Sequence, residues 1–151
     1  MAYPFDTVWA FSLTKAKFGA GAAAEIGYEA KALGAKRVLV VTDQGVAKAG
    51  LVDRVVEPLK KEKIRVDVWD RSEPEPSRES IEEAIKSVEE RVDLYVGLGG
   101  GSSIDTAKIV NLVGSPADLL GTVIVKDGLA PGEHVLPEQT VASGGRAVVT
   151  G

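Results

Sequence analysis

The sequence is poor in the side chains that most often carry covalent or metal chemistry. Its 151 residues include no cysteine and one histidine, His134. The lack of cysteine excludes disulfides, thiolate zinc sites and cysteine nucleophiles. One histidine in a stretch rich in glycine and proline is typical of a surface loop, and it cannot supply a metal site of several fixed ligands or a credible Ser/His/Asp arrangement. We therefore predict no metal site and no catalytic residue in this chain.

Other features are equally scarce. No apolar run approaches the roughly 20 residues that a membrane-spanning helix needs, and residues 1–6 lack the basic start of a secretory signal. The 18 basic and 22 acidic residues give a net charge of −4 without the basic stripe of a nucleic-acid-binding protein. The 44% hydrophobic and 26% charged residues are typical of a globular protein, and 151 residues give room for one domain of typical size. We expect a cytoplasmic protein with no nucleic-acid or membrane partner.

From about residue 22 the sequence alternates two periodicities. Helical spacing covers residues 23–33, 51–61 and 78–88, with Ser77 as the predicted N-cap of the third helix. Strand-like runs cover 37–43, 64–70 and 93–98. The first is continuously apolar, as in a strand buried on both faces, and the second alternates as in a strand nearer the edge. This order predicts an α/β fold, a Rossmann-like open parallel sheet with helices on both faces.

The two ends of the chain follow this pattern less well. Residues 3–21 predict a strand or two, residues 121–128 predict one strand with a turn, and residues 129–151 have little periodicity. We therefore predict a nucleotide-binding α/β domain over residues 1–120. The remaining residues, 121–151, are expected to form a divergent tail of one strand plus an irregular segment.

A glycine-rich turn separates the third strand from a helix that we expect to begin at Ser102 or Ser103. Gly99, Gly100 and Gly101 leave no side chains over the helix's first turn, where backbone N–H groups lack partners. Those donors and the positive end of the helix dipole suit a pyrophosphate. The alternative is a tight turn with a capping box of Ser102 and Asp105, for which one glycine would suffice. Three glycines favour the phosphate site.

Asp43 ends the first strand, and its function depends on the strand order. Ligands of open parallel sheets bind at the carboxyl ends of the strands, where the order reverses. If the strands run 2-1-3, Asp43 lies beside the glycine turn and can accept hydrogen bonds from a ribose. Aspartate is also common as a solvated residue at strand ends and turns. Taken alone, Asp43 is slightly better explained as such a solvated residue than as a ribose ligand.

These segments resemble a known family. Residues 99–108, GGGSSIDTAK, closely resemble the G-G-G-S-x-x-D-x-x-K signature of the iron-containing (group III) alcohol dehydrogenases. The V-T-D ending of residues 37–43, F-G-A-G-A at 18–22 and the paired prolines of 74–76 are similar to further segments of that family, in the same order. The resemblance covers roughly residues 8–120. The start at residues 6–11 and the region of Tyr28 look most like the hydroxyacid-oxoacid transhydrogenase branch.

The resemblance implies the fold of a dehydroquinate synthase-like N-terminal domain and a nicotinamide dinucleotide as partner. It puts the coenzyme phosphates at residues 100–103, the adenosine ribose at Asp43 and the adenosine near the Glu75 loop. A carboxylate at Asp43 should repel a 2′-phosphate, which favours NAD over NADP. Lys108 belongs to the signature but is equally explained as an ordinary helix lysine. The implied cofactor-binding residues are Asp43, Glu75, Gly99, Gly100, Gly101, Ser102, Ser103 and Asp105.

The resemblance also implies parts that this chain lacks. Complete family members bind iron or zinc through one aspartate and three histidines of a helical C-terminal metal domain, which is missing here. Residues 140–147 match the family's T-T-x-G-T-G-S-E segment poorly. The function implied is the NAD-binding domain of a metal-dependent alcohol or 2-hydroxyacid dehydrogenase, incomplete and inactive alone. The alternatives are a non-catalytic nucleotide-binding or assembly module and a dehydroquinate synthase-like cyclase fragment. We also expect a homo-oligomer with residues 3–18 near the contact.

Overall fold

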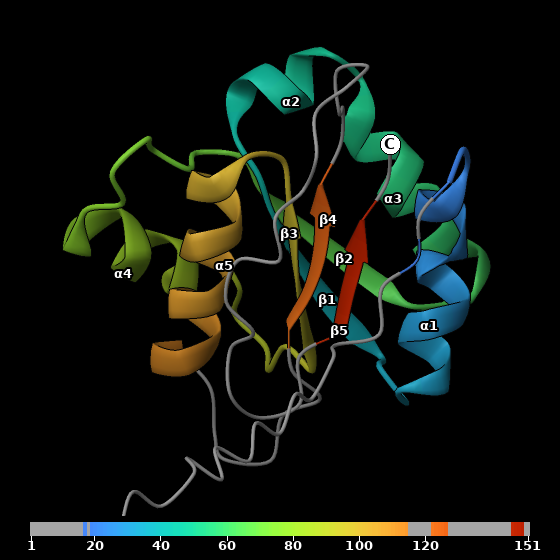
Figure 1. The fold of residues 1–151 in the computed structure, drawn as a ribbon. Coiled ribbons are helices and arrows are strands. Elements are labelled where there is room, and N and C mark those ends of the chain that lie inside the picture. The colour runs from blue at the N-terminus through green and yellow to red at the C-terminus, as the bar shows by residue number, and fades with distance from the viewer. Residues whose placement is uncertain (1–16, 18, 115–121, 127–145, 150–151) are drawn as a thin grey trace, which may run out of the picture.

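A single parallel sheet organises the molecule (Figure 1). The computed structural model describes residues 17 and 19–114, and the backbone of residues 122–126 and 146–149. The five strands have the order β2-β1-β3-β4-β5, and every neighbouring pair is parallel. They are β1 (Arg37–Val41), β2 (Arg65–Trp69), β3 (Leu94–Leu98), β4 (Thr122–Lys126) and β5 (Arg146–Val149). The predicted open parallel α/β fold is confirmed, and the first three strands have the 2-1-3 order on which the placement of Asp43 depends.

Helices cover both faces of this sheet, as the right-handed crossovers of a parallel sheet require. The helical segments are η1 (Ala22–Glu25), α1 (Ile26–Ala32), α2 (Gln44–Lys48), α3 (Leu51–Lys61), α4 (Arg78–Lys86) and α5 (Gly101–Gly114). In Figure 1, α1 and α3 lie on one side of the sheet, and α4 and α5 lie on the other. The three helices predicted before the glycine turn are confirmed, and Ser77 caps α4 by accepting from the N–H of Ser80 at 3.1 Å.

The core consists of two clusters, one on each face, and β1 contributes to both. Val38 and Val40 point into the cluster formed with α1 and α3, whereas Leu39 and Val41 point into the cluster with α4 and α5. All four side chains have no exposed surface. Because successive side chains of a strand point to opposite faces, a strand buried on both faces must be apolar at every position. This explains the continuous run that the sequence shows.

The remaining strands continue the sheet on the far side of β3. The strand predicted within residues 121–128 is confirmed as β4, which pairs with β3. β5 follows β4 in the sheet and was not predicted, because its run of four residues lies in a region without periodicity. The same sheet therefore draws strands from the segments 1–120 and 121–151. The strands predicted within residues 3–21 fall largely outside the described residues.

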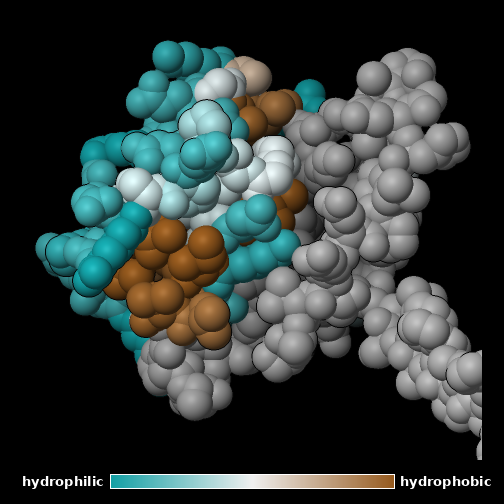
Figure 2. All heavy atoms as spheres, turned by 60° about the vertical axis from the view of Figure 1, so that its left-hand side comes forward, coloured by the Kyte–Doolittle hydropathy of each residue, from teal (hydrophilic) through white to brown (hydrophobic). Residues whose placement is uncertain are grey.

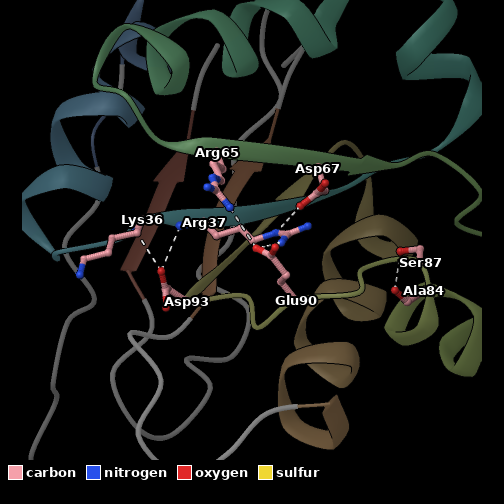
Figure 3. A network of polar contacts seen from close by, with 8 residues as sticks. All are labelled: Lys36, Arg37, Arg65, Asp67, Ala84, Ser87, Glu90 and Asp93. Carbon is pink, nitrogen blue, oxygen red and sulfur yellow. Dashed lines mark hydrogen bonds and ion pairs between the residues drawn. The ribbon is translucent and has the colours of Figure 1, made fainter.

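Asp93 anchors the amino end of β1 to the start of β3. Its Oδ2 accepts hydrogen bonds from the backbone N–H groups of Lys36, at 2.9 Å, and Arg37, at 3.0 Å (Figure 3). These donors precede or begin the ladder of β1, so they need an acceptor at the edge of the sheet. One carboxylate satisfies both and aligns the starts of two neighbouring strands.

Arg37 joins β1 to β2 and to the α4–β3 connection at the same edge. Its Nε donates to Asp67 at 2.7 Å, and its terminal nitrogen donates to Glu90 at 2.5 Å (Figure 3). Arg65 of β2 also donates to Glu90, at 3.0 Å. The hydrogen bond with Asp67, followed by the charges of Asp67 and Glu90, raises the pKa of Arg37 above its ordinary value. The amino edge of the sheet is thus held by a connected set of charges.

The outer surface of α5 is apolar near its end. Ile109, Leu112 and Val113 are exposed, and Leu112 leaves 83% of its surface accessible. Figure 2 shows an apolar patch on the side of the molecule where α4 and α5 lie. None of the described helices is both long and apolar enough to cross a membrane.

Candidate functional site

Two glycines let α5 lie close to the end of β3. A Cβ at Gly97 would come within 3.0 Å of the Ile104 Cα, so this position admits no side chain without moving the helix backbone. Gly99 has a φ of +126°, a conformation that other residues rarely adopt. A Cβ there would also lie 3.2 Å from Asp43 Oδ2 and 3.2 Å from Val46 Cγ2. These two glycines are required by packing and backbone geometry.

The next two glycines, Gly100 and Gly101, have a different environment. Both are exposed, and a Cβ at either position would meet nothing within 4 Å. The N–H of Ile104 donates to the carbonyl of Gly100 at 3.2 Å, so the N–H groups before it have no helical partner. The surface over the first turn of α5 is consequently open and lined by backbone donors. This geometry suits an anion.

Asp43 lies beside this turn, as the 2-1-3 order predicts. It caps the N-terminus of α2, where its Oδ1 accepts from the N–H of Val46 at 3.0 Å. Its Oδ2 accepts from the hydroxyl of Ser103 at 3.2 Å. Thr42 holds the carboxyl ends of β1 and β3 together, because its buried hydroxyl donates to the carbonyl of Leu98 at 2.8 Å. The short helix α2, which we did not predict, thus places Asp43 against α5.

The structure brings a third segment to the same place. Ser102 Oγ donates to the carbonyl of Pro74 at 3.1 Å, which holds the loop after β2 against the start of α5. Glu75, the next residue in that loop, is exposed. The carboxyl ends of β1, β2 and β3 are therefore connected around the glycine turn through Asp43, Pro74 and the two serines of α5.

The start of α5 differs from the prediction. The helix begins at Gly101 rather than at Ser102 or Ser103, so both serines lie within its first turn. Asp105 is exposed and pairs with Lys108 at 3.1 Å. The alternative of a capping box is wrong, because Ser102 does not precede the helix and its hydroxyl donates to Pro74 instead.

Two polar atoms near the end of β2 stay without partners in the part of the chain that the structure describes. They are Trp69 Nε1 and Ser72 Oγ, both buried. Within that same part, no group of three or more histidine, cysteine, aspartate or glutamate residues could hold a metal ion. His134 lies outside the described residues.

The fold and the site together define a class of protein. An open parallel sheet, with a glycine turn opening a helix at its carboxyl edge, is the architecture of nucleotide-binding α/β domains. The family model described as iron-containing alcohol dehydrogenase matches residues 14–142. Since that match covers most of the chain, the chain belongs to the iron-containing alcohol dehydrogenase family.

Individual relatives agree with this assignment. Long-chain-alcohol dehydrogenase 1 of Geobacillus thermodenitrificans is 42% identical over 107 residues, which cover 68% of this chain and 27% of the relative. The mitochondrial hydroxyacid-oxoacid transhydrogenase of Bos taurus is 33% identical over 114 residues, which cover 75% of this chain and 24% of the relative. The chain is therefore similar to the predicted transhydrogenase branch and also to alcohol dehydrogenases outside that branch.

Solved structures show the same similarity in three dimensions. The NADH-dependent butanol dehydrogenase A of Thermotoga maritima superposes with a TM-score of 0.69 and 29% identity, covering 79% of this chain and 34% of that one. The chain thus spans about a quarter to a third of the length of these three proteins.

Proposed function

We propose that this chain is the NAD-binding domain of a metal-dependent alcohol or 2-hydroxyacid dehydrogenase. The observation that carries the proposal is the open first turn of α5, with Gly100 and Gly101 exposed and Asp43 beside them. The backbone donors suit the pyrophosphate, and the carboxylate suits a ribose. When bound, the nicotinamide supplies a hydride acceptor. Similarity to dehydrogenases, one of them named as NADH-dependent, supports the same function.

The phosphates would lie over residues 100–103, and Glu75 would lie near the adenosine. The absence of side chains at Gly100 and Gly101 leaves room for a ligand to approach the backbone. Gly99 would act indirectly, by keeping the turn in its left-handed conformation. Asp105 keeps its place in the family signature, and its exposed carboxylate pairs with Lys108 on α5.

The open turn suggests a direct test of the phosphate site. We expect Gly100→Ala to weaken NAD binding and Gly100→Val to abolish it, because each added carbon occupies the space over the helix N-terminus. Isothermal titration with NAD measures the affinity, and circular dichroism should show unchanged helical content, since a Cβ at Gly100 meets no protein atom within 4 Å. Ala32→Val, at an exposed position of α1, is the matched control. Equal affinity in the Gly100 series would contradict the proposal.

Asp43 should set the preference for NAD over NADP. A carboxylate facing a 2′-phosphate combines charge repulsion with the loss of hydrogen bonds to the ribose, an effect of about 1–3 kcal/mol. We expect Asp43→Gly to reduce the preference for NAD, measured as the ratio of the two dissociation constants. An unchanged ratio, or tight NADP binding by the unaltered chain, would count against this role.

The residues of this chain do not fit the metal that the family uses. With one histidine and no cysteine, they cannot form the family's ligand set. Among the described residues, no group of three or more histidine, cysteine, aspartate or glutamate side chains could hold a metal ion. We propose that the chain alone does not oxidise alcohols. Incubation with NAD, iron or zinc, and short alcohols or 2-hydroxyacids should yield no NADH above the protein-free control. Turnover that a chelator removes would contradict this.

NAD binding without turnover is also what a non-catalytic nucleotide-binding module would show.

We further propose that the protein is cytoplasmic and assembles with itself. The exposed apolar residues Ile109, Leu112 and Val113 support an assembly, because surfaces of this kind commonly contact a partner. Of residues 3–18, which we expect near the contact, all except Lys17 lie outside the described residues. Sedimentation velocity should find a dimer or larger species. A monomer at every concentration would contradict the proposal.

A further inference from the structure

Ser103 has a role that differs from that of a phosphate ligand. We propose that the Ser103 hydroxyl orients the Asp43 carboxylate toward the ribose and thereby sharpens the preference for NAD over NADP. Ser103 is in this sense a positioning residue, which acts through Asp43. The inference rests on the proposed NAD-binding function and adds to it a residue that determines specificity.

The burial of Ser103 supports this role. Only 1% of the residue is exposed, so its side chain points into the protein rather than toward the open surface over α5. Its hydroxyl has a single proton, which it donates to Asp43 Oδ2 at 3.2 Å. That proton is therefore not available to a phosphate oxygen. What remains for a phosphate is the backbone N–H of the same residue.

Gly99 makes this contact possible. A Cβ at Gly99 would lie 3.2 Å from Asp43 Oδ2 and 3.3 Å from Ser103 Oγ, at the place where the two side chains meet. The missing side chain leaves the space that the carboxylate and the hydroxyl occupy. The glycine at this position is thus explained by the pairing of Asp43 with Ser103 as well as by its positive φ.

The two oxygens of Asp43 are each fixed by one protein donor. Oδ1 accepts from the N–H of Val46 at 3.0 Å, and Oδ2 accepts from Ser103. An ionised carboxylate offers about four acceptor positions, which leaves roughly one on each oxygen for the two hydroxyls of a ribose. A carboxylate held at both oxygens before the ligand arrives loses less conformational freedom on binding. Without Ser103, only Oδ1 would be held.

Binding of the two coenzymes to Ser103→Ala tests this inference. We expect NAD affinity to fall about five- to tenfold, the scale of one hydrogen bond, and NADP affinity to change less than about twofold. The preference for NAD therefore narrows. The matched control is Ser80→Ala, which removes another buried hydroxyl from the first turn of a helix, where it donates to the carbonyl of Ser77 at 3.1 Å. In the control, both affinities should stay unchanged.

A ligand-free measurement tests the contact itself. We expect Ser103→Ala to lower the Tm when it is the only substitution. Introduced into a chain that already carries Asp43→Ala, it should lower the Tm by less than about half as much. Purely additive Tm changes would overturn the inference, because Ser103 would then act without Asp43.

The binding outcomes separate this inference from the proposed function. Equal losses of NAD and NADP affinity in Ser103→Ala would overturn the inference, since they indicate general damage to the glycine turn. Unchanged NAD and NADP affinities in Ser103→Ala would also overturn the inference. The proposed function would still stand in that case, provided that the unaltered chain binds NAD. If the unaltered chain binds no NAD, both fail together.

Discussion

The two edges of the sheet are built in opposite ways. At the amino edge, Asp93 and Arg37 take part in hydrogen bonds that join the start of β1 to β2 and to the start of β3 (Figure 3). At the carboxyl edge, Gly100 and Gly101 leave the first turn of α5 without side chains above it. Charged groups meet one another at the first edge, whereas backbone donors without helical partners face outward at the second.

This difference separates what holds the strands together from what can bind a ligand. Partners at the amino edge come from the protein itself, so changes there should alter stability and leave binding intact. At the carboxyl edge, Asp43 and the two serines of α5 position the turn, and its exposed glycines leave space for a ligand. Changes at the exposed glycines should therefore alter binding and leave stability intact. Three predictions test this division.

The largest effect on stability is expected for Gly99, the glycine of the turn that packing and backbone geometry require. Gly99→Ala forces an alanine into a φ of +126° and places its Cβ 3.2 Å from Asp43 and Val46. The backbone strain should cost about 1–3 kcal/mol, and overpacking should add about 1–3 kcal/mol. Urea unfolding measures the loss. Gly100→Ala, one residue further on, is the matched control and should change stability little. Equal stabilities of the two variants would refute the proposed distinction between these glycines.

A smaller effect is expected for Asp93 at the amino edge. Asp93→Ala leaves the N–H groups of Lys36 and Arg37 without their acceptor, a loss of about 1–3 kcal/mol. NAD affinity should stay unchanged, because the altered residue is at the opposite end of β3 from the glycine turn. Chemical denaturation and titration calorimetry on the same preparation measure the two quantities. A drop in NAD affinity at unchanged stability would reverse the roles that we assign to the two edges.

The smallest effect is expected for Arg65. Both Arg65 and Arg37 donate to Glu90, but the Arg65 side chain is 74% exposed and the Arg37 side chain only 16%. Arg65→Met should cost about 0–1 kcal/mol and lose its effect in high salt, and Arg37→Met should cost more. Since the pKa of Arg37 is raised in the fold, the contribution of its charge to the stability of the fold is fully present below its unfolded pKa and lost only as pH rises through the folded value. Changing the pH around neutrality should therefore leave this contribution intact, so the experiment varies the salt concentration instead. Equal losses for the two arginines would show that burial does not separate them.

Most of the fold could be predicted because its signals are local. The continuous apolar run of β1, the helical spacing of α3 and the Ser77 cap of α4 each depend on residues close together in the sequence. β5 escaped prediction because a four-residue run in a long aperiodic region gives little periodicity to read. α2 escaped for a similar reason, since a helix of five residues has too few turns to show a repeat.

The sequence by itself determined the parallel α/β class, the glycine turn and the aspartate at the end of β1, because residue type and spacing encode these directly. The strand order that brings this aspartate to the turn, and the partners of the two serines, were decided only by the tertiary structure. Ser103 and Asp43 are 60 residues apart in sequence, and Ser102 and Pro74 are 28 apart. Their contacts exist because the strand order brings the carboxyl ends of β1, β2 and β3 together at one edge. A hydroxyl can donate to a phosphate, a carboxylate or a carbonyl, so its residue type alone does not select the acceptor.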